Sequence, residues 1–250
     1  MGGAQVGGWL CRALLMGLLA VAASVAARAQ ATPDLDSLNN LVGRLYGEGK
    51  YAEATHVAEQ LLALTESRHG PDHPSLSTPL NNLALLYREL GRYAEAAPLC
   101  RRSLAIVEKE LGPGHPLVAT SLNNLALLYY TQGRYGEAEP LYQRALAIRE
   151  KALGPAHPSV GTSLNNLAAL YRSQGRYAEA EPLYQRALSI YEKALGPDHP
   201  DVGTSLDNLA ELYRSQGRAE AEPLFRRAAA IREKALRAAR QQNPAGEGKK

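Results

Sequence analysis

Apolar residues along most of the chain recur at intervals of three and four, which is the spacing of one face of an α-helix. Leu80, Leu83 and Tyr87 follow this spacing, and a second run with the same spacing extends from Ala96 to Val107. The pattern predicts two amphipathic helices in succession, each with one face buried.

Glycine and proline mark the ends of these two helices. Gly91 follows the first helix, and Gly112 and Pro113 follow the second. Glycine accepts the left-handed conformation of a helix cap, and proline has no N–H with which to continue a helix. Pro116 then suits the first turn of the next helix. The predicted unit is therefore helix, turn, helix.

The same unit recurs along the chain with a constant period of 42 residues. A period of this length indicates helix pairs that stack side by side, so we predict an all-α fold of the α-solenoid type. The repeated positions are His73, His115, His157 and His199; Tyr87, Tyr129, Tyr171 and Tyr213; and Gly49, Gly91, Gly133, Gly175 and Gly217.

These repeats resemble the tetratricopeptide repeat. In the second unit its signature positions hold Leu83, Ala84, Tyr87, Gly91, Ala96 and Cys100. The run Leu-Asn-Asn-Leu-Ala-Leu-Leu-Tyr at 80–87 and 122–129, together with Gly-Pro-Asp-His-Pro at 70–74 and 196–200, is similar to the kinesin-light-chain type.

The resemblance implies a right-handed superhelical array of five repeats over residues 36–236. It does not imply a motor role, because no heptad pattern precedes Leu35. The expected repeats are 36–74, 75–116, 117–158, 159–200 and 201–236, and residues 237–250 are expected to form a frayed helix end and then a disordered polar tail.

The first 29 residues have the pattern of a secretory signal peptide, with Arg12 followed by an apolar run from Ala13 to Ala27. We expect cleavage near Ala29 or Ala31, and a short linker at 30–35. The chain is then a bacterial-style secreted form of the repeat, periplasmic or secreted. The alternative is an uncleaved segment that anchors the chain in the inner membrane.

Charge and composition exclude several function classes. The formal net charge is +3, and removal of Arg12 and Arg28 with residues 1–29 lowers it to +1. Near-neutral charge without a basic stripe disfavours nucleic-acid binding. No enzyme motif is present, so we expect no catalysis, no cofactor and no small-molecule substrate. The repeated histidines lie in turns, where we expect them to cap helices rather than bind metal, and we expect Cys100 to fill the core.

The candidate binding residues lie on the first helix of each unit, opposite the apolar face. Asparagine is unfavourable inside helices, yet its amide offers a donor and an acceptor to a peptide backbone. In kinesin-light-chain repeats such asparagines clamp a peptide, which the resemblance carries to Asn82, Asn124, Asn166 and Asn208. The further candidates are Asn81, Asn123, Asn165, Arg88, Arg172 and Arg214.

Two functions remain open from the sequence. The first is a scaffold or adaptor that binds an extended peptide or a partner protein in the concave groove lined by the first helices. The alternative is a structural or self-assembling spacer whose terminal repeats pair end to end. A similar choice applies to the asparagines, since one of each pair could instead bond the neighbouring repeat.

Overall fold

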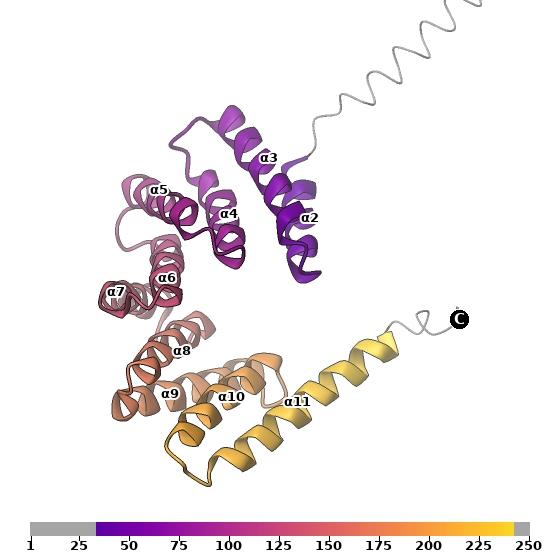
Figure 1. Cartoon of the computed structure of the whole chain (residues 1–250), viewed down its shortest axis with the longest axis vertical. Helices are drawn as coiled ribbons and strands as arrows, with labels where there is room; N and C mark the ends of the chain where they lie inside the picture. Colours follow the sequence, from indigo (N-terminus) through magenta and orange to yellow (C-terminus); the bar gives the residue numbers. More distant parts are fainter. Residues whose placement is uncertain (1–33, 243–250) are drawn as a thin grey trace, which may run out of the picture.

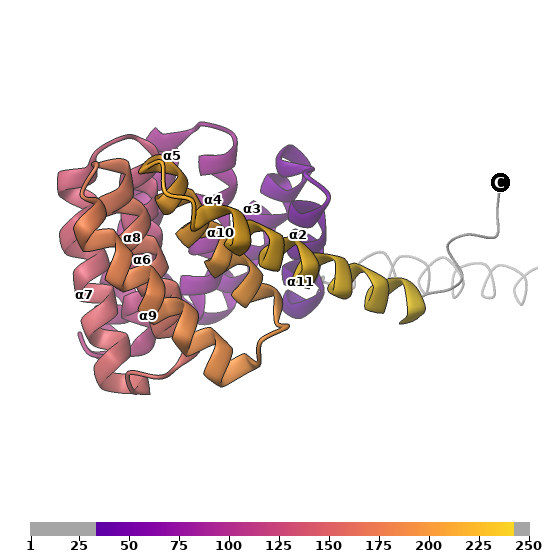
Figure 2. The ribbon, with the colours of Figure 1, turned by 90° about the horizontal axis from the view of Figure 1, so that it is seen from below.

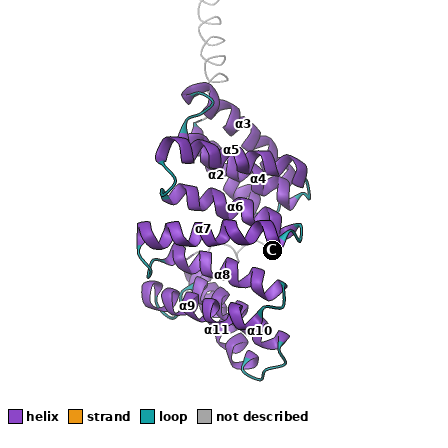
Figure 3. Cartoon of the chain, turned by 90° about the vertical axis from the view of Figure 1, so that its left-hand side faces the viewer, coloured by secondary structure: helices purple, strands orange, loops and turns teal. Residues whose placement is uncertain are grey.

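A computed structural model describes residues 34–242, and within this range the chain forms helices without a strand (Figure 3). The first repeat consists of α2 and α3, the second of α4 and α5 with a short 3-10 turn, η1, before them, and the later repeats follow in pairs. The elements are α2 (Leu35–Gly47), α3 (Tyr51–His69), η1 (Pro74–Leu76), α4 (Ser77–Glu89), α5 (Tyr93–Leu111), α6 (Pro116–Thr131), α7 (Tyr135–Leu153), α8 (Pro158–Ser173), α9 (Tyr177–Leu195), α10 (Pro200–Ser215) and α11 (Ala221–Gln242).

The repeats stack along an arc (Figure 1). Helices α4, α6 and α8 lie on its inner side, and α5, α7 and α9 lie on its outer side. Each helix contacts the next one in the chain, and each first helix also contacts the first helix of the following repeat. The predicted all-α solenoid is confirmed.

A histidine directly precedes the 3-10 turn η1 and each of the three helices α6, α8 and α10. The Nδ1 atom accepts a hydrogen bond from the backbone N–H two residues further on, at 3.1–3.2 Å. This bond satisfies one of the free donors of the first turn, and the following proline has no N–H to satisfy. The histidines His73, His115, His157 and His199 are therefore N-caps, as expected.

The turn inside each repeat depends on a glycine in the left-handed region. In the second repeat Gly91 has a φ of 71°, which lets the Arg92 N–H reach back to the Tyr87 carbonyl at 2.7 Å. The Arg92 guanidinium then lies 4.3 Å from the centroid of the Tyr87 ring. The same cation–π pair recurs in the next three repeats.

Small residues allow the two helices of a repeat to approach closely. Ala96, Ala138 and Ala180 are fully buried near the start of their outer helices. Larger side chains fill the space beyond them, and Tyr142 and Tyr184 are among the largest fully buried side chains in the described chain. The core thus combines small residues at the close approaches of helices with large side chains beside them.

Ion pairs at equivalent positions join neighbouring outer helices. Each pairs an arginine of one repeat with a glutamate of the preceding repeat, and each is partly exposed. We call this row the outer ladder. Its members are Arg102–Glu66, Arg144–Glu108, Arg186–Glu150 and Arg227–Glu192.

The C-terminal end differs from the expected boundary. Helix α11 continues to Gln242 and extends beyond the other helices (Figure 2), so residues 237–242 belong to this helix, where the sequence predicted a frayed helix end before a disordered tail. The run from Ala221 to Gln242 lacks glycine and contains proline only in its first turn, and this composition allows the helix to propagate. The remaining tail lies outside the described residues.

The expected signal peptide at 1–29 and most of the linker at 30–35 also lie outside the described residues. Asp34 already caps α2 by accepting a hydrogen bond from the Ser37 N–H, and Leu35 is helical. Between residues 34 and 242 no helix is both long enough and apolar enough to span a bilayer.

Candidate functional site

The second asparagine of each pair lies half-buried on the inner helices, as the pattern predicts. Two of the four also bond the preceding repeat: Asn82 donates to the Asn39 side chain at 3.1 Å, and Asn166 donates to Asn123 at 2.7 Å. Asn124 and Asn208 make no such bond within the described chain. The second asparagine therefore bonds the preceding repeat at two junctions and makes no such bond at the other two.

The first asparagine does not point uniformly into the groove. Asn81 and Asn165 are each only 9% exposed, so the expectation that Asn81 faces away from the core is wrong for these two repeats. The helix that carries each of them contacts the first helix of the following repeat. Each asparagine leaves its Oδ1 buried without a hydrogen-bond partner. Asn123 is half-buried, and the equivalent residue in the fifth repeat, Asp207, pairs with Arg232.

The three candidate arginines have different surroundings. Arg88 is half-buried and pairs with Glu89. Arg214 is exposed, pairs with Glu211 at 2.5 Å and lies 5.7 Å from the centroid of the Phe225 ring. Arg172 is half-buried and makes no ion pair within residues 34–242. The structure therefore does not bring the three together, and they lie one to a helix along the inner side.

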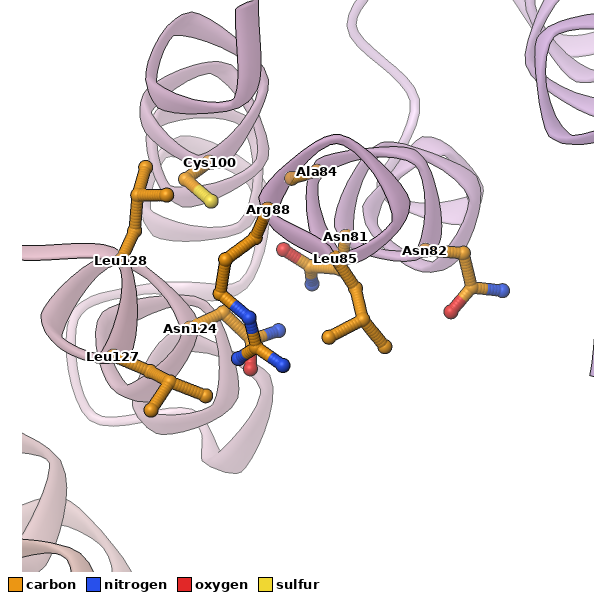
Figure 4. A pocket seen from close by; sticks show the side chains of 9 residues that line it. All are labelled: Asn81, Asn82, Ala84, Leu85, Arg88, Cys100, Asn124, Leu127 and Leu128. Atoms are coloured by element: carbon orange, nitrogen blue, oxygen red, sulfur yellow. The ribbon is translucent and has the colours of Figure 1, made fainter. Parts of the chain in front are cut away.

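A cavity of about 80 Å³ lies between the second and third repeats, and it includes four of the predicted residues (Figure 4). The Arg88 side chain extends from α4 toward Asn124 and Leu127 of α6, and the Cys100 thiol lies on α5 between Leu128 and Ala84. Polar atoms thus border an apolar interior. The lining residues are Asn81, Asn82, Ala84, Leu85, Arg88, Cys100, Asn124, Leu127 and Leu128.

Cys100 accounts for the depth of this cavity. The equivalent positions hold Tyr142, Tyr184 and Phe225, and the larger side chains of Tyr142 and Tyr184 are fully buried. Burial raises the pKa of the Cys100 thiol to about 11, so the thiol is neutral near pH 7 and acts as an apolar surface. Its position in the core is as expected. Sequence reasoning missed the cavity, although the exchange of tyrosine for cysteine was the signal for it.

A second, shallower pocket of about 310 Å³ lies between α2 and α4. Its apolar lining comes from Val42, Tyr46, Leu85 and Leu86, and its polar lining includes Asn82. Leu85 lines both pockets. The apolar part of the candidate site therefore runs along the first three repeats, and sequence reasoning, which selected polar residues, did not include it.

The polar groups of the candidate site are amides and arginines, and the thiol nearest to them is neutral. Within residues 34–242 no group of three histidine, cysteine or acidic side chains is arranged to hold a metal ion. Such a surface can donate and accept hydrogen bonds and cover apolar side chains.

Known proteins share this architecture. The crystal structure of nearly identical TPR-like repeats assigned to a kinesin light chain of Podosopora anserina is 33% identical, with a TM-score of 0.63, and the match covers 81% of this chain and 97% of that one. A glutamine-to-methionine variant of it, also 33% identical, has a TM-score of 0.65 with 81% and 96% covered. BtubC (BKLC) from P. vanneervenii is 25% identical, with a TM-score of 0.62 and 86% and 83% covered.

A search of curated proteins gives no match. The model of the family described as tetratricopeptide repeat matches residues 34–99, 75–151, 124–193 and 159–234, which together span the whole described array except the end of α11. The chain therefore belongs to the tetratricopeptide repeat family, and its structural neighbours are of the kinesin-light-chain type.

Proposed function

We propose that the chain is a scaffold or adaptor that binds an extended peptide segment, or a partner protein through such a segment, along the inner side of the arc. Tetratricopeptide repeats generally mediate protein–protein interactions and are typically not enzymes. The observation that carries the proposal is the cavity between the second and third repeats, because Asn81, Asn82, Arg88 and Asn124 all line it.

The lining suits a peptide better than a single small polar molecule. Asn124 offers an amide donor and an acceptor beside the cavity, and the buried Oδ1 of Asn81 lacks a donor. An extended backbone presents unpaired N–H and C=O groups to such amides. Leu85 and Leu127 then cover an apolar side chain of the same peptide.

The hydrogen bonds separate the binding candidates from the stacking residues. Asn124 has no bond to the preceding repeat, whereas Asn166 donates to Asn123. Asn124 is therefore the sharper test of binding, and Asn166 serves as its counterpart in the stack.

The test is selection of peptides from a displayed random library, with the full chain as the target. Affinities of the selected peptides are then measured for Asn124→Ala and for Cys100→Tyr, which fills the cavity with the residue that the chain uses in its third and fourth repeats. We expect each substitution to weaken binding at least about tenfold, with unchanged circular dichroism.

Lys151→Ala is the matched control, because Lys151 is exposed on the outer helix α7 and is expected to leave affinity unchanged. Equal affinity of the wild type and both groove variants for every selected peptide would place binding elsewhere on the array.

The alternative function, a spacer whose terminal repeats pair end to end, is less well supported, because the last helix, α11, lacks one of the leucines that pack between repeats. Leu104, Leu146 and Leu188 pack in clusters between successive repeats, whereas the equivalent residue of α11 is the exposed Ala229. The exchange of leucine for alanine reduces the apolar surface that this part of α11 offers to another chain. We expect a monomer in light scattering, and a concentration-dependent oligomer lost on truncation of 203–250 would support the alternative.

The proposal also places the chain outside the cytoplasm, on the basis of residues 1–29 alone. Mass spectrometry of the chain from an expressing bacterium is expected to show a form that begins at Gln30 or Thr32. That form lacks tryptophan fluorescence, because Trp9 is the only tryptophan. An intact mass in the membrane fraction would support the anchored alternative.

A further inference from the structure

Two junctions of the array are held by the same polar clip. At the third–fourth junction Glu139 accepts hydrogen bonds from the Tyr171 hydroxyl at 3.1 Å and from Arg176 at 2.7 Å, and Gln143 donates to the same hydroxyl at 3.2 Å. At the fourth–fifth junction Glu181, Tyr213, Arg218 and Gln185 repeat these bonds.

The first junction has a different set of ties. The Tyr87 hydroxyl donates to Glu59 at 2.9 Å, and Asn82 donates to Asn39. Arg102 adds a hydrogen bond to the backbone carbonyl of Pro71 at 2.8 Å. Three of the four junctions therefore anchor the tyrosine of the following repeat to the preceding outer helix.

The second–third junction lacks this anchor. Ala97 stands where the third and fourth repeats have glutamate, and Arg101 stands where these two repeats have glutamine. In the described chain no hydrogen bond joins Tyr129 to α5, and Arg134 pairs only within its own repeat, with Glu137 at 2.6 Å and with Gln132.

The inner side of this junction has no bond between asparagines within residues 34–242, as at the fourth–fifth junction. Asn124 does not bond Asn81, whose Oδ1 stays buried and unpaired, and the cavity lies between them. The remaining polar ties are the Ser103–Ser121 hydroxyl pair at 2.9 Å and the exposed Arg144–Glu108 pair. The apolar cluster of Ala96, Leu125 and Leu128 is continuous, so the repeats still pack against each other.

We infer that the array bends at the junction between the second and third repeats, with α2–α5 as one body and α6–α11 as the other. A junction held mainly by apolar contacts resists separation but tolerates small rotations, since those contacts are not directional. At the other three junctions the hydrogen-bonded tyrosine fixes the angle between repeats. Because the cavity spans the bending junction, its depth changes with the angle.

The test moves the clip from one junction to another in the full chain. Ala97→Glu with Arg101→Gln gives the second repeat the clip residues of the third, with Tyr129 and Arg134 already in place. Glu139→Ala with Gln143→Arg does the reverse at the third–fourth junction. Amide hydrogen exchange is followed in the helices on both sides of each junction.

In the wild type we expect faster exchange in α5 and α6 than in α7 and α8. The first pair of substitutions should slow exchange in α5 and α6 about tenfold, which corresponds to about one charge-assisted hydrogen bond. It should also narrow the distribution of dimensions in small-angle X-ray scattering. The reverse pair should raise exchange in α7 and α8 to the wild-type level of α5 and α6.

Equal exchange at the two junctions of the wild type would overturn the inference. So would a folded Ala97→Glu, Arg101→Gln chain whose exchange and scattering match the wild type. If that chain does not fold, the reverse pair decides, because unchanged exchange in α7 and α8 shows that the clip does not control the junction.

Discussion

The second and fourth repeats have the same pair of helices but differ at two positions of the outer helix, one in the core and one beside the next repeat. The fourth repeat fills its core with Tyr184 and clips the next repeat through Glu181. The second repeat has Cys100 and Ala97 at these positions, and a cavity beside them. The comparison indicates that stacking of the repeats depends on the apolar residues that both repeats share. The residue at the position of Cys100 or Tyr184 then determines whether a cavity remains between one repeat and the next.

The largest expected effect on stability comes from truncation of the buried tyrosine in the fourth repeat. Tyr184→Ala removes a fully buried ring and should lower the free energy of unfolding by about 3–5 kcal/mol. Cys100→Ala, at the equivalent position of the second repeat, should cost about 1 kcal/mol. Urea denaturation followed by circular dichroism measures both. Similar losses at the two positions would remove the contrast between the repeats.

A glycine in the fourth repeat gives the next largest effect. A Cβ on Gly161 would lie 2.9 Å from the Tyr191 ring, so Gly161→Ala should destabilise the chain by about 1–3 kcal/mol. The second repeat avoids this conflict by pairing Ser77 with the smaller Val107.

Gly203 of the fifth repeat is the matched control for this substitution. An added Cβ there meets Ile231 at 3.5 Å, an ordinary contact, so Gly203→Ala should be neutral or stabilise by up to about 1 kcal/mol through helix propensity. Thermal unfolding should give shifts of opposite sign for the two variants. Destabilisation by both would show that Tyr191 is not the cause.

The asparagines give a smaller effect. Asn166→Ala removes the bond to Asn123 and should cost about 1 kcal/mol, whereas Asn124→Ala removes no bond to the preceding repeat and should cost less than about 0.5 kcal/mol. Paired denaturation curves check this difference. If Asn124→Ala were the costlier change, Asn124 would have to be regarded as a stacking residue.

The smallest effect concerns the reactivity of Cys100. Because its pKa is raised from 9.0 to about 11, the stability that the buried neutral thiol contributes is complete below pH 9 and is lost as the pH rises toward 11. A thiol reagent at pH 8 should therefore react only as fast as the chain opens. Reaction at the rate of a free thiol in the folded chain would show that the cavity admits the reagent.

Much of the fold could be predicted because the same pattern of residues recurs in each repeat. The recurrence of Leu83, Gly91 and Pro116 in equivalent positions predicts helix faces, turns and helix starts from local rules. The histidine caps were predictable for the same reason, since a cap involves residues only two apart. The extension of α11 to Gln242 was not, because the end of the array has no following unit with which to compare it.

The candidate site was predicted less completely because it depends on contacts between repeats. Helical spacing places Asn81 beside Asn82, but burial of Asn81 follows from α6, which packs against α4. The two bonded pairs, Asn82 with Asn39 and Asn166 with Asn123, likewise join residues in different repeats. A single helix therefore cannot tell a ligand-facing amide from one that joins repeats.

The outer ladder has a mechanical consequence. Its four ion pairs join the outer sides of neighbouring repeats, while buried apolar contacts join the repeats within the core. Salt screens partly exposed pairs such as Arg186–Glu150 and leaves apolar contacts almost unaffected. Rising ionic strength should therefore lengthen the outer circumference alone, so that the array behaves as a spring whose curvature increases with salt.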